Sequence, residues 1–200
     1  FPWSSDYTVV SLPGAKIQVI FKVLRLPFHE GFRAAVAFGG TNNIVVRAGH
    51  PHGSPEKVGK FKAVVEQIQK QTLLFLQEHP DKTLVLSEIP PRLGGNFVSE
   101  SNKVINRVNN CLAKMCNEHK RAHKSAGHLS LLTVWLPLRD PSCFKTKHDG
   151  SVDIQLNAHG ITSVLNTLFG MPGIDSSVER PGSAESDGNA SADAGVLWKN

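Results

Sequence analysis

A loop of glycine and asparagine that follows a run of five apolar residues, Ala34–Phe38, offers groups that could stabilise negative charge. In Gly39–Asn43 the glycines permit close backbone approach, and the amide of Asn42 could donate to a developing oxyanion. Pro13-Gly14 ends another β-branched run, and the backbone N–H of Gly14 could be a second donor. Both segments are also ordinary turn signals, because Asn, Gly and Pro favour turns. Each segment therefore predicts either half of an oxyanion hole or a simple turn.

The stretch 147–160 could supply a general base and the carboxylate that orients it. It contains His148, Asp149 and His159, ahead of a last run with helical periodicity. An imidazole takes a proton from a nucleophile when a carboxylate holds its ring, as in Ser-His-Asp catalysis. The alternative is a plain loop followed by a helix that Asn157 caps. The residues alone leave both interpretations open.

These loops need a scaffold that brings them together, and the order of the periodic runs predicts one. Short β-like runs at 7–12, 34–38, 83–86 and 129–136 alternate with helix-like runs at 15–26, 54–79, 104–116 and 158–169. This order is typical of βαβ units with a parallel sheet covered on both faces. Sites in such sheets lie outside the carboxyl ends of the strands, where Gly14 and Asn42 are expected to meet.

Composition divides the chain into two parts. Residues 171–200 are rich in Ser, Gly, Ala and Asp and carry a net charge of −3, whereas residues 1–170 carry +8. We predict a globular domain over 1–170 and a disordered acidic tail over 171–200. The basic globular part could favour polyanions such as RNA, or it could be an ordinary basic surface.

Cysteine usage and hydropathy bear on the compartment. Cys111, Cys116 and Cys143 are odd in number and lack the spacing of a metal site, which predicts reduced thiols, no metal or other cofactor, and a cytoplasmic or nuclear protein. No run approaches the ~20 apolar residues of a membrane span. Phe1–Asp6 shows no secretory signal and no initiator Met, so we expect the chain to begin inside a larger protein.

The loops, taken in order, resemble the sequence blocks of the SGNH (GDSL-type) ester hydrolases. Ser11–Ile17 resembles the family's glycine block, Gly40–Asn43 its Gly-x-Asn-Asp block, and Leu156–Gly160 the opening of its final helix. The resemblance covers about Tyr7–Phe169. It implies a three-layer α/β/α sandwich with a mainly parallel, flavodoxin-like sheet, and an oxyanion hole made by Gly14 and Asn42.

A further segment resembles one branch of this family. Ser87–Arg92, with Asn102, Asn106 and Leu112 after it, is similar to the SGNH-like domains of animal non-LTR retrotransposons and genes derived from them. In those domains an apolar-x-Pro-Arg run precedes asparagines at helical spacing.

The chain departs from the family pattern at the other catalytic groups. The Gly-Asp-Ser block that carries the nucleophile either lies before Phe1 or does not exist in this protein, and the first strand of the sheet would then be missing as well. Gln155 and Val152 stand where the family has its histidine and its acid. Asp149 and His159 are the nearest substitutes.

Two functions therefore follow from the resemblance. The first is an impaired serine esterase that acts on a small acyl ester. The second is a non-catalytic binding module for RNA or protein, since an SGNH-like domain of a germ-plasm protein lacks the triad and binds RNA. Lys120, Arg121 and Lys124 are the candidate RNA-binding residues, although cations are also favoured at a helix C-terminus by its dipole.

Overall fold

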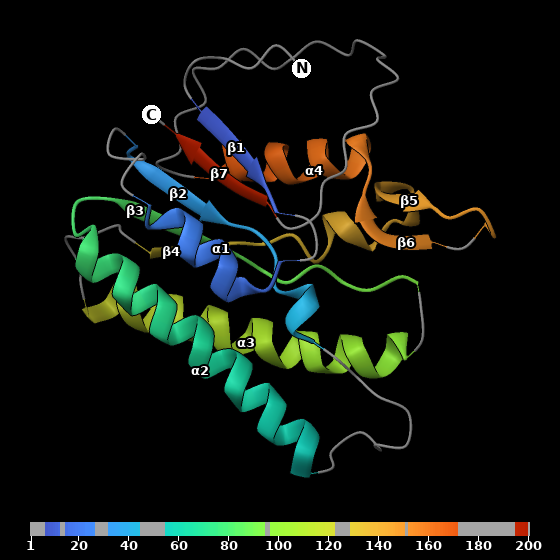
Figure 1. Ribbon diagram of the computed structural model, residues 1–200, viewed down its shortest axis with the longest axis horizontal. Helices are drawn as coiled ribbons and strands as arrows, with labels where there is room; N and C mark the ends of the chain where they lie inside the picture. Colours follow the sequence, from blue (N-terminus) through green and yellow to red (C-terminus); the bar gives the residue numbers. More distant parts are fainter. Residues whose placement is uncertain are drawn as a thin grey trace.

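The computed structural model describes residues 7–12, 15–26, 32–44, 55–94, 97–122, 129–150, 152–171 and 195–199. These residues form a five-stranded sheet, a separate two-stranded hairpin and four α-helices (Figure 1). The sheet contains β1 (Tyr7–Ser11), β2 (Ala34–Ala37), β3 (Thr83–Ser87), β4 (Leu129–Leu132) and β7 (Gly195–Lys199), and the hairpin β5 (Phe144–Thr146) and β6 (Val152–Leu156). The helices are α1 (Ile17–Leu24), α2 (Pro55–Glu78), α3 (Val98–Ala122) and α4 (Ala158–Phe169), with single 3₁₀ turns η2 (Thr41–Asn43), η3 (Pro137–Arg139) and η4 (Pro141–Cys143).

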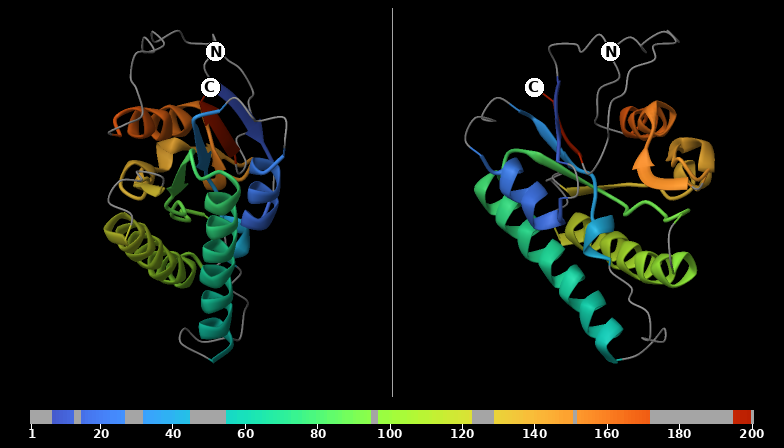
Figure 2. Two further views of the ribbon diagram at one scale, coloured as in Figure 1. Left: turned by 90° about the vertical axis from the view of Figure 1, so that its left-hand side faces the viewer. Right: turned by 45° about the vertical axis from the view of Figure 1, so that its right-hand side comes forward.

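Apolar side chains of the central strands alternate between two core clusters. Ala35 and Leu84 pack with α1, α2 and α3, whereas Val36 and Val85 pack with α4, the hairpin and the turns before it. Successive side chains of a strand point to opposite faces, so a strand that is apolar at every position is covered on both. Figure 2 shows the helices on either side of the sheet. The predicted three-layer α/β class with a mainly parallel sheet is confirmed.

The sheet has the order β1-β7-β2-β3-β4. β2, β3 and β4 are parallel, and β7 runs antiparallel to both β1 and β2. β7 thus fills the place between β1 and β2. An empty place would leave two rows of unpaired backbone groups, and β7 pairs both.

The tail prediction is wrong for Gly195–Lys199, because those residues form β7. The run Val196-Leu197-Trp198 is β-branched and apolar enough to enter a sheet. Residues 172–194 lie outside the described residues, so the prediction for them stays a prediction.

β4 is shorter than predicted. It ends at Leu132 rather than at residue 136, because the N–H groups of Val134 and Trp135 bond to the carboxylate of Glu88 instead of a strand. Pro137 then opens a 3₁₀ turn. The other strands and helices lie where their patterns predict them, but α3 extends beyond 104–116 at both ends and the β5–β6 hairpin was not predicted.

Candidate functional site

The loop after β2 is held in shape by contacts to α1 and to the segment after β3. Gly40 has φ +101°, in the left-handed region that favours glycine, and a Cβ there would lie 3.0 Å from Cδ1 of Ile89. Oδ1 of Asn43 accepts the N–H of Ile17 (2.8 Å), and the Asn43 amide donates to Oε1 of Gln18 (3.1 Å). Asn43 therefore caps the start of α1 from outside the helix.

Asn42, the predicted oxyanion donor, lies in the same loop and is half-buried. Its amide donates to the C=O of Ala15 over 3.4 Å, which is long for a hydrogen bond. Gly14, the other predicted donor, lies outside the described residues. The oxyanion pair therefore stays a prediction, and the observed role of the Asn42 amide is to contact the backbone that leads into α1.

The carboxylate of Glu88, directly after β3, holds the end of the neighbouring strand. It accepts the N–H of Val134 (3.0 Å) and of Trp135 (2.9 Å). A carboxylate that accepts backbone N–H groups makes charge-assisted bonds, which are stronger than neutral ones. Glu88 is thus engaged in ending β4.

Arg92 joins the segment after β3 to the loop after β2. Its guanidinium donates to the C=O of Thr41 (3.1 Å) and of Ile44 (2.8 Å). Burial lowers the pKa of Arg92, which nonetheless stays protonated as arginine does throughout proteins. The cation therefore holds two backbone carbonyls beside Asn42.

Two asparagines of α3 support the same segment. Asn109, which is 5% exposed, accepts the N–H of Ile89 (2.8 Å) and donates to its C=O (3.0 Å). Asn102 does the same for Arg92, with both bonds at 2.8 Å. Asn106, the other asparagine that carries the resemblance, is exposed. Seven residues are about two helical turns, which keeps Asn102 and Asn109 on one side of α3.

The opening of α4 is also fixed by polar contacts. Oδ1 of Asn157 accepts the N–H of Gly160 (3.0 Å), which confirms the predicted cap, and the Asn157 amide donates to the C=O of Ser142 (2.7 Å) and of Phe144 (2.9 Å). A Cβ on Gly160 would lie 2.1 Å from the carbonyl oxygen of Cys143. The Leu-Asn-x-x-Gly motif is therefore required for packing α4 against the chain before the hairpin.

Asp149 and His159, the predicted acid and base, are both exposed. Asp149 lies in the turn between β5 and β6, and His159 lies in the first turn of α4. The pKa of Asp140 is lowered first by hydrogen bonds from Ser142 and then by the nearby His159. A general base of the Ser-His-Asp kind needs an imidazole that is held by its own carboxylate, so the acid and base roles of Asp149 and His159 stay a prediction.

Basic side chains gather on the solvent face of α3. The four exposed residues, which we call the basic row, are Lys103, Arg107, Lys114 and Arg121. At 100° per residue they fall within a sector about 40° wide, and they extend over about 27 Å of helix. Glu118 pairs with Lys114 at 3.7 Å, but both side chains are largely exposed, so the pair contributes little. The opposite side of α3 is buried in the core, which fixes the direction of the row.

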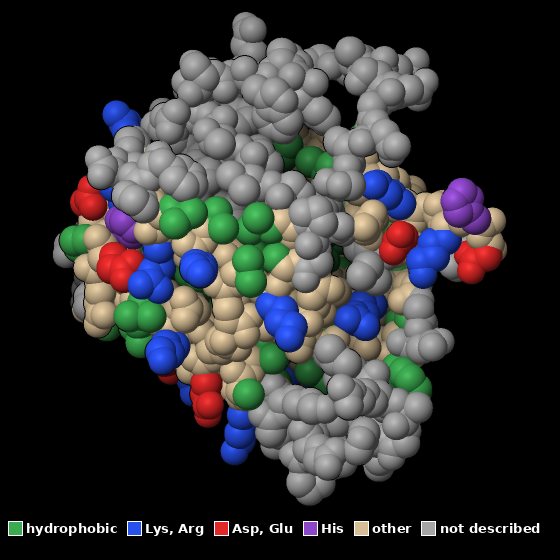
Figure 3. Space-filling model, in the orientation of Figure 1, with side chains coloured by type: hydrophobic (Ala, Val, Ile, Leu, Met, Phe, Trp, Pro, Cys, Tyr) green, Lys and Arg blue, Asp and Glu red, His purple; other side chains and the backbone are tan. Residues whose placement is uncertain are grey.

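The face formed by α1 and α2 differs. Figure 3 shows its basic side chains lying singly, with acidic and hydrophobic side chains between them. On α2, for example, exposed Lys62 and Lys70 alternate with Glu66 and Glu78. Charge is therefore mixed there and concentrated along α3.

The three predicted RNA-binding residues have different positions. Arg121 belongs to the basic row. Lys120 lies about 100° further round the helix and lines a pocket beside β4. Lys124 lies outside the described residues. The other members of the row were missed, although their spacing from Lys103 to Arg107, Lys114 and Arg121 is a readable helical pattern.

Within the described residues, no group of three or more His, Cys, Asp or Glu side chains could hold a metal ion. None of the described helices is both long and apolar enough to cross a membrane. No protein-family model and no curated protein matches the chain.

Proposed function

We propose that this chain is a non-catalytic binding module, built on a scaffold like that of the SGNH hydrolases, which binds RNA through the basic row of α3. The observation that carries the proposal is the alignment of four exposed cations on one side of a rigid helix. Lysine and arginine side chains bind phosphates and release counterions, which supplies most of the sequence-independent affinity for nucleic acid. A straight row of cations fits a phosphate backbone better than the mixed charges of α2 do.

The state of the hydrolase-like motifs supports a non-catalytic role. Asn43, Arg92 and Asn157 use their polar atoms to hold backbone groups. His159 is exposed, and its neighbours include Asp140, whose pKa it helps to lower. These residues of the hydrolase-like motifs therefore have structural or surface positions in this chain.

The composition of the row indicates how RNA would bind. Asn110, which is exposed, lies between Arg107 and Lys114 along the helix and could donate to phosphate or sugar oxygens. None of the residues on this side of α3 is aromatic, so the row offers no surface for base stacking. We therefore expect binding that depends on the backbone and tolerates changes of base sequence.

The cysteines fit a reducing compartment. Cys111, Cys116 and Cys143 are free, and burial raises the pKa of Cys116 to about 11, which keeps its thiol protonated. Free thiols are the norm in the cytoplasm and nucleus, where RNA is found. We propose one of these locations for the protein.

Fluorescence anisotropy with a labelled 20-nucleotide RNA tests the proposal. The test variant removes four charges from the row: Lys103→Gln, Arg107→Gln, Lys114→Gln and Arg121→Gln. The matched control removes four lysines elsewhere: Lys62→Gln, Lys70→Gln, Lys145→Gln and Lys147→Gln. We expect the row variant to bind at least about tenfold more weakly, and the control to lose no more than about threefold. Equal losses in the two variants would show that only net charge matters and would overturn the proposed site.

A further inference from the structure

The outer edge of β4 can accept another strand. β4 is the last strand of the sheet, and no strand among the described residues pairs with that edge. The C=O of Leu132 accepts the N–H of Glu88 (2.8 Å), so the backbone of Leu132 points toward β3. Alternate residues of a strand bond to opposite sides, so the N–H and C=O of Leu131 point toward the open edge. Such groups are a template for a further strand.

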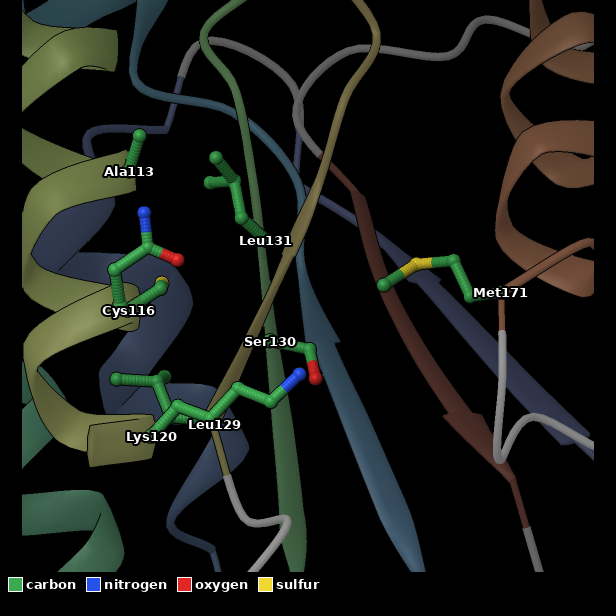
Figure 4. A pocket seen from close by; sticks show the side chains of 8 residues that line it. Ala113, Cys116, Lys120, Leu129, Ser130, Leu131 and Met171 are labelled. Carbon is green, nitrogen blue, oxygen red and sulfur yellow. The ribbon is translucent and has the colours of Figure 1, made fainter. Parts of the chain in front are cut away.

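A pocket of about 240 Å³ lies along this edge, between α3 and Met171, the second residue after α4 (Figure 4). Leu131 and Met171 form part of its apolar wall, and Asn117, Lys120 and Ser130 supply polar groups. In Figure 4 the side chain of Lys120 extends from α3 toward Ser130 of β4. The pocket therefore combines an open strand edge, apolar walls and one cation.

The charge of Lys120 selects among possible occupants. Lys120 is exposed, and no ion pair of its side chain is found within the described part of the chain. A second copy of this protein that paired its own β4 here would bring a second Lys120 to the same edge, and like charges directly opposite are destabilising. A strand with an acidic side chain would instead have a complementary charge at this position.

We infer that the outer edge of β4 binds an extended acidic peptide segment, whose backbone pairs with Leu131 and whose carboxylate binds Lys120. Strand addition of this kind takes affinity from main-chain hydrogen bonds and specificity from pockets for alternate side chains. The site lies on a different side of α3 from the basic row, so it does not depend on the proposed RNA binding.

Lys120 could have a simpler role, because a lysine beside an edge strand also protects it against unwanted pairing. The two roles predict opposite results for Lys120→Gln. If Lys120 only blocks unwanted pairing, its removal should let neutral strands bind more tightly. If Lys120 binds a carboxylate of the ligand, its removal should make acidic strands bind more weakly.

The experiment measures binding of three labelled peptides to the full chain by fluorescence anisotropy. The first is Thr-Val-Glu-Val-Glu-Val-Thr, the second has Gln in place of both Glu residues, and the third is the first with alternate backbone nitrogens methylated. Lys120→Gln is the test variant. Lys103→Gln, which removes the same charge from the basic row, is the control.

We expect the acidic peptide to bind the unaltered chain about fivefold more tightly than the Gln peptide, which is the upper range for one exposed ion pair. The ratio should fall to about one in Lys120→Gln and persist in Lys103→Gln. The methylated peptide should not bind, because it cannot form the ladder of hydrogen bonds. Amide exchange at Leu131 should slow when the acidic peptide is added.

Three results would overturn the inference. The methylated peptide could bind as well as the first one, or the preference for the acidic peptide could survive Lys120→Gln. Alternatively, Lys120→Gln could tighten binding of the Gln peptide without weakening binding of the acidic peptide. Lys120 would then only block unwanted strand pairing.

Discussion

The segment after β3 and the region around α4 differ in how far their polar side chains are engaged with the backbone. In Glu88–Arg92 the carboxylate and guanidinium, together with two asparagines of α3, are hydrogen-bonded to backbone groups. Around α4, Asn157 and two threonines are hydrogen-bonded to backbone groups of α4 and the chain before it, while the predicted base His159 faces solvent. Residues that resemble a hydrolase motif can therefore be explained by packing wherever they are buried. The exposed residues, such as His159, make no contact described above that would support a catalytic role.

The largest effect is expected at Gly160, where this explanation relies on close packing. Gly160→Ala places a Cβ 2.1 Å from the carbonyl oxygen of Cys143, so α4 or η4 has to shift. We expect a loss of about 3 kcal/mol in the free energy of unfolding, measured with urea. Gly170→Ala is the control, because its Cβ would lie 3.3 Å from the oxygen of Asn166 and little has to move. Similar losses in both variants would contradict the packing explanation.

Substitutions of Asn109 and Asn106 compare the contributions of the buried and exposed sides of α3 to stability. Asn109→Ala removes both hydrogen bonds to Ile89 and leaves its buried N–H and C=O without partners. The free energy of unfolding should fall by about 2–3 kcal/mol. Asn106→Ala, on the exposed side, should change it by less than about 0.5 kcal/mol. A larger loss in Asn106→Ala than in Asn109→Ala would contradict this explanation.

The buried thiol of Cys116 gives a pH dependence. Its pKa is raised to about 11, from 9.0 in a free thiol, so the folded chain holds a proton that the unfolded chain loses between these values. Stability should be complete below pH 9 and fall as the pH rises toward 11, by no more than about 2 kcal/mol from this group. Cys116→Ala should remove that part of the slope, whereas Cys111→Ala, at a half-buried site, should leave it. A slope unchanged by Cys116→Ala would assign the effect to other groups.

The smallest effect is expected at the predicted base. His159→Ala should change the free energy of unfolding by less than about 0.5 kcal/mol, because the side chain is exposed. It should also leave hydrolysis of p-nitrophenyl acetate at the rate of the unaltered chain. Hydrolysis that is well above the buffer rate and is lost in His159→Ala and Asn42→Ala would instead restore the esterase interpretation.

The sequence predicts the three layers and most helices and strands, because hydrophobic periodicity and turn residues are local signals. It identified the Asn157 cap for the same reason. The sequence did not predict β7. Its five residues follow a polar stretch, and their position depends on pairing with both β1 and β2, which is not a local signal. The choice of Asn109 over Asn106 depends on which side of α3 faces Ile89, and that is fixed by packing of the whole helix.

The candidate functional residues were likewise predicted only where the signal is local. The run of basic residues at 119–124 predicted a role for Arg121. The basic row that Arg121 belongs to is recognised only when α3 extends from Val98 to Ala122. Lys120, its neighbour in sequence, belongs to the pocket beside β4. Adjacent residues of a helix point about 100° apart, so a cluster in sequence divides between two surfaces.

The salt dependence of RNA affinity tests the central claim most directly. Each phosphate contact contributes about −0.7 to the slope of log K against log salt for a single strand, so four contacts contribute about −3. Neutralising Lys103, Arg107, Lys114 and Arg121 should make the slope less steep by about 3, and neutralising Lys62, Lys70, Lys145 and Lys147 should change it by less than about 1. Identical slopes for the two variants would contradict RNA binding by the basic row of α3.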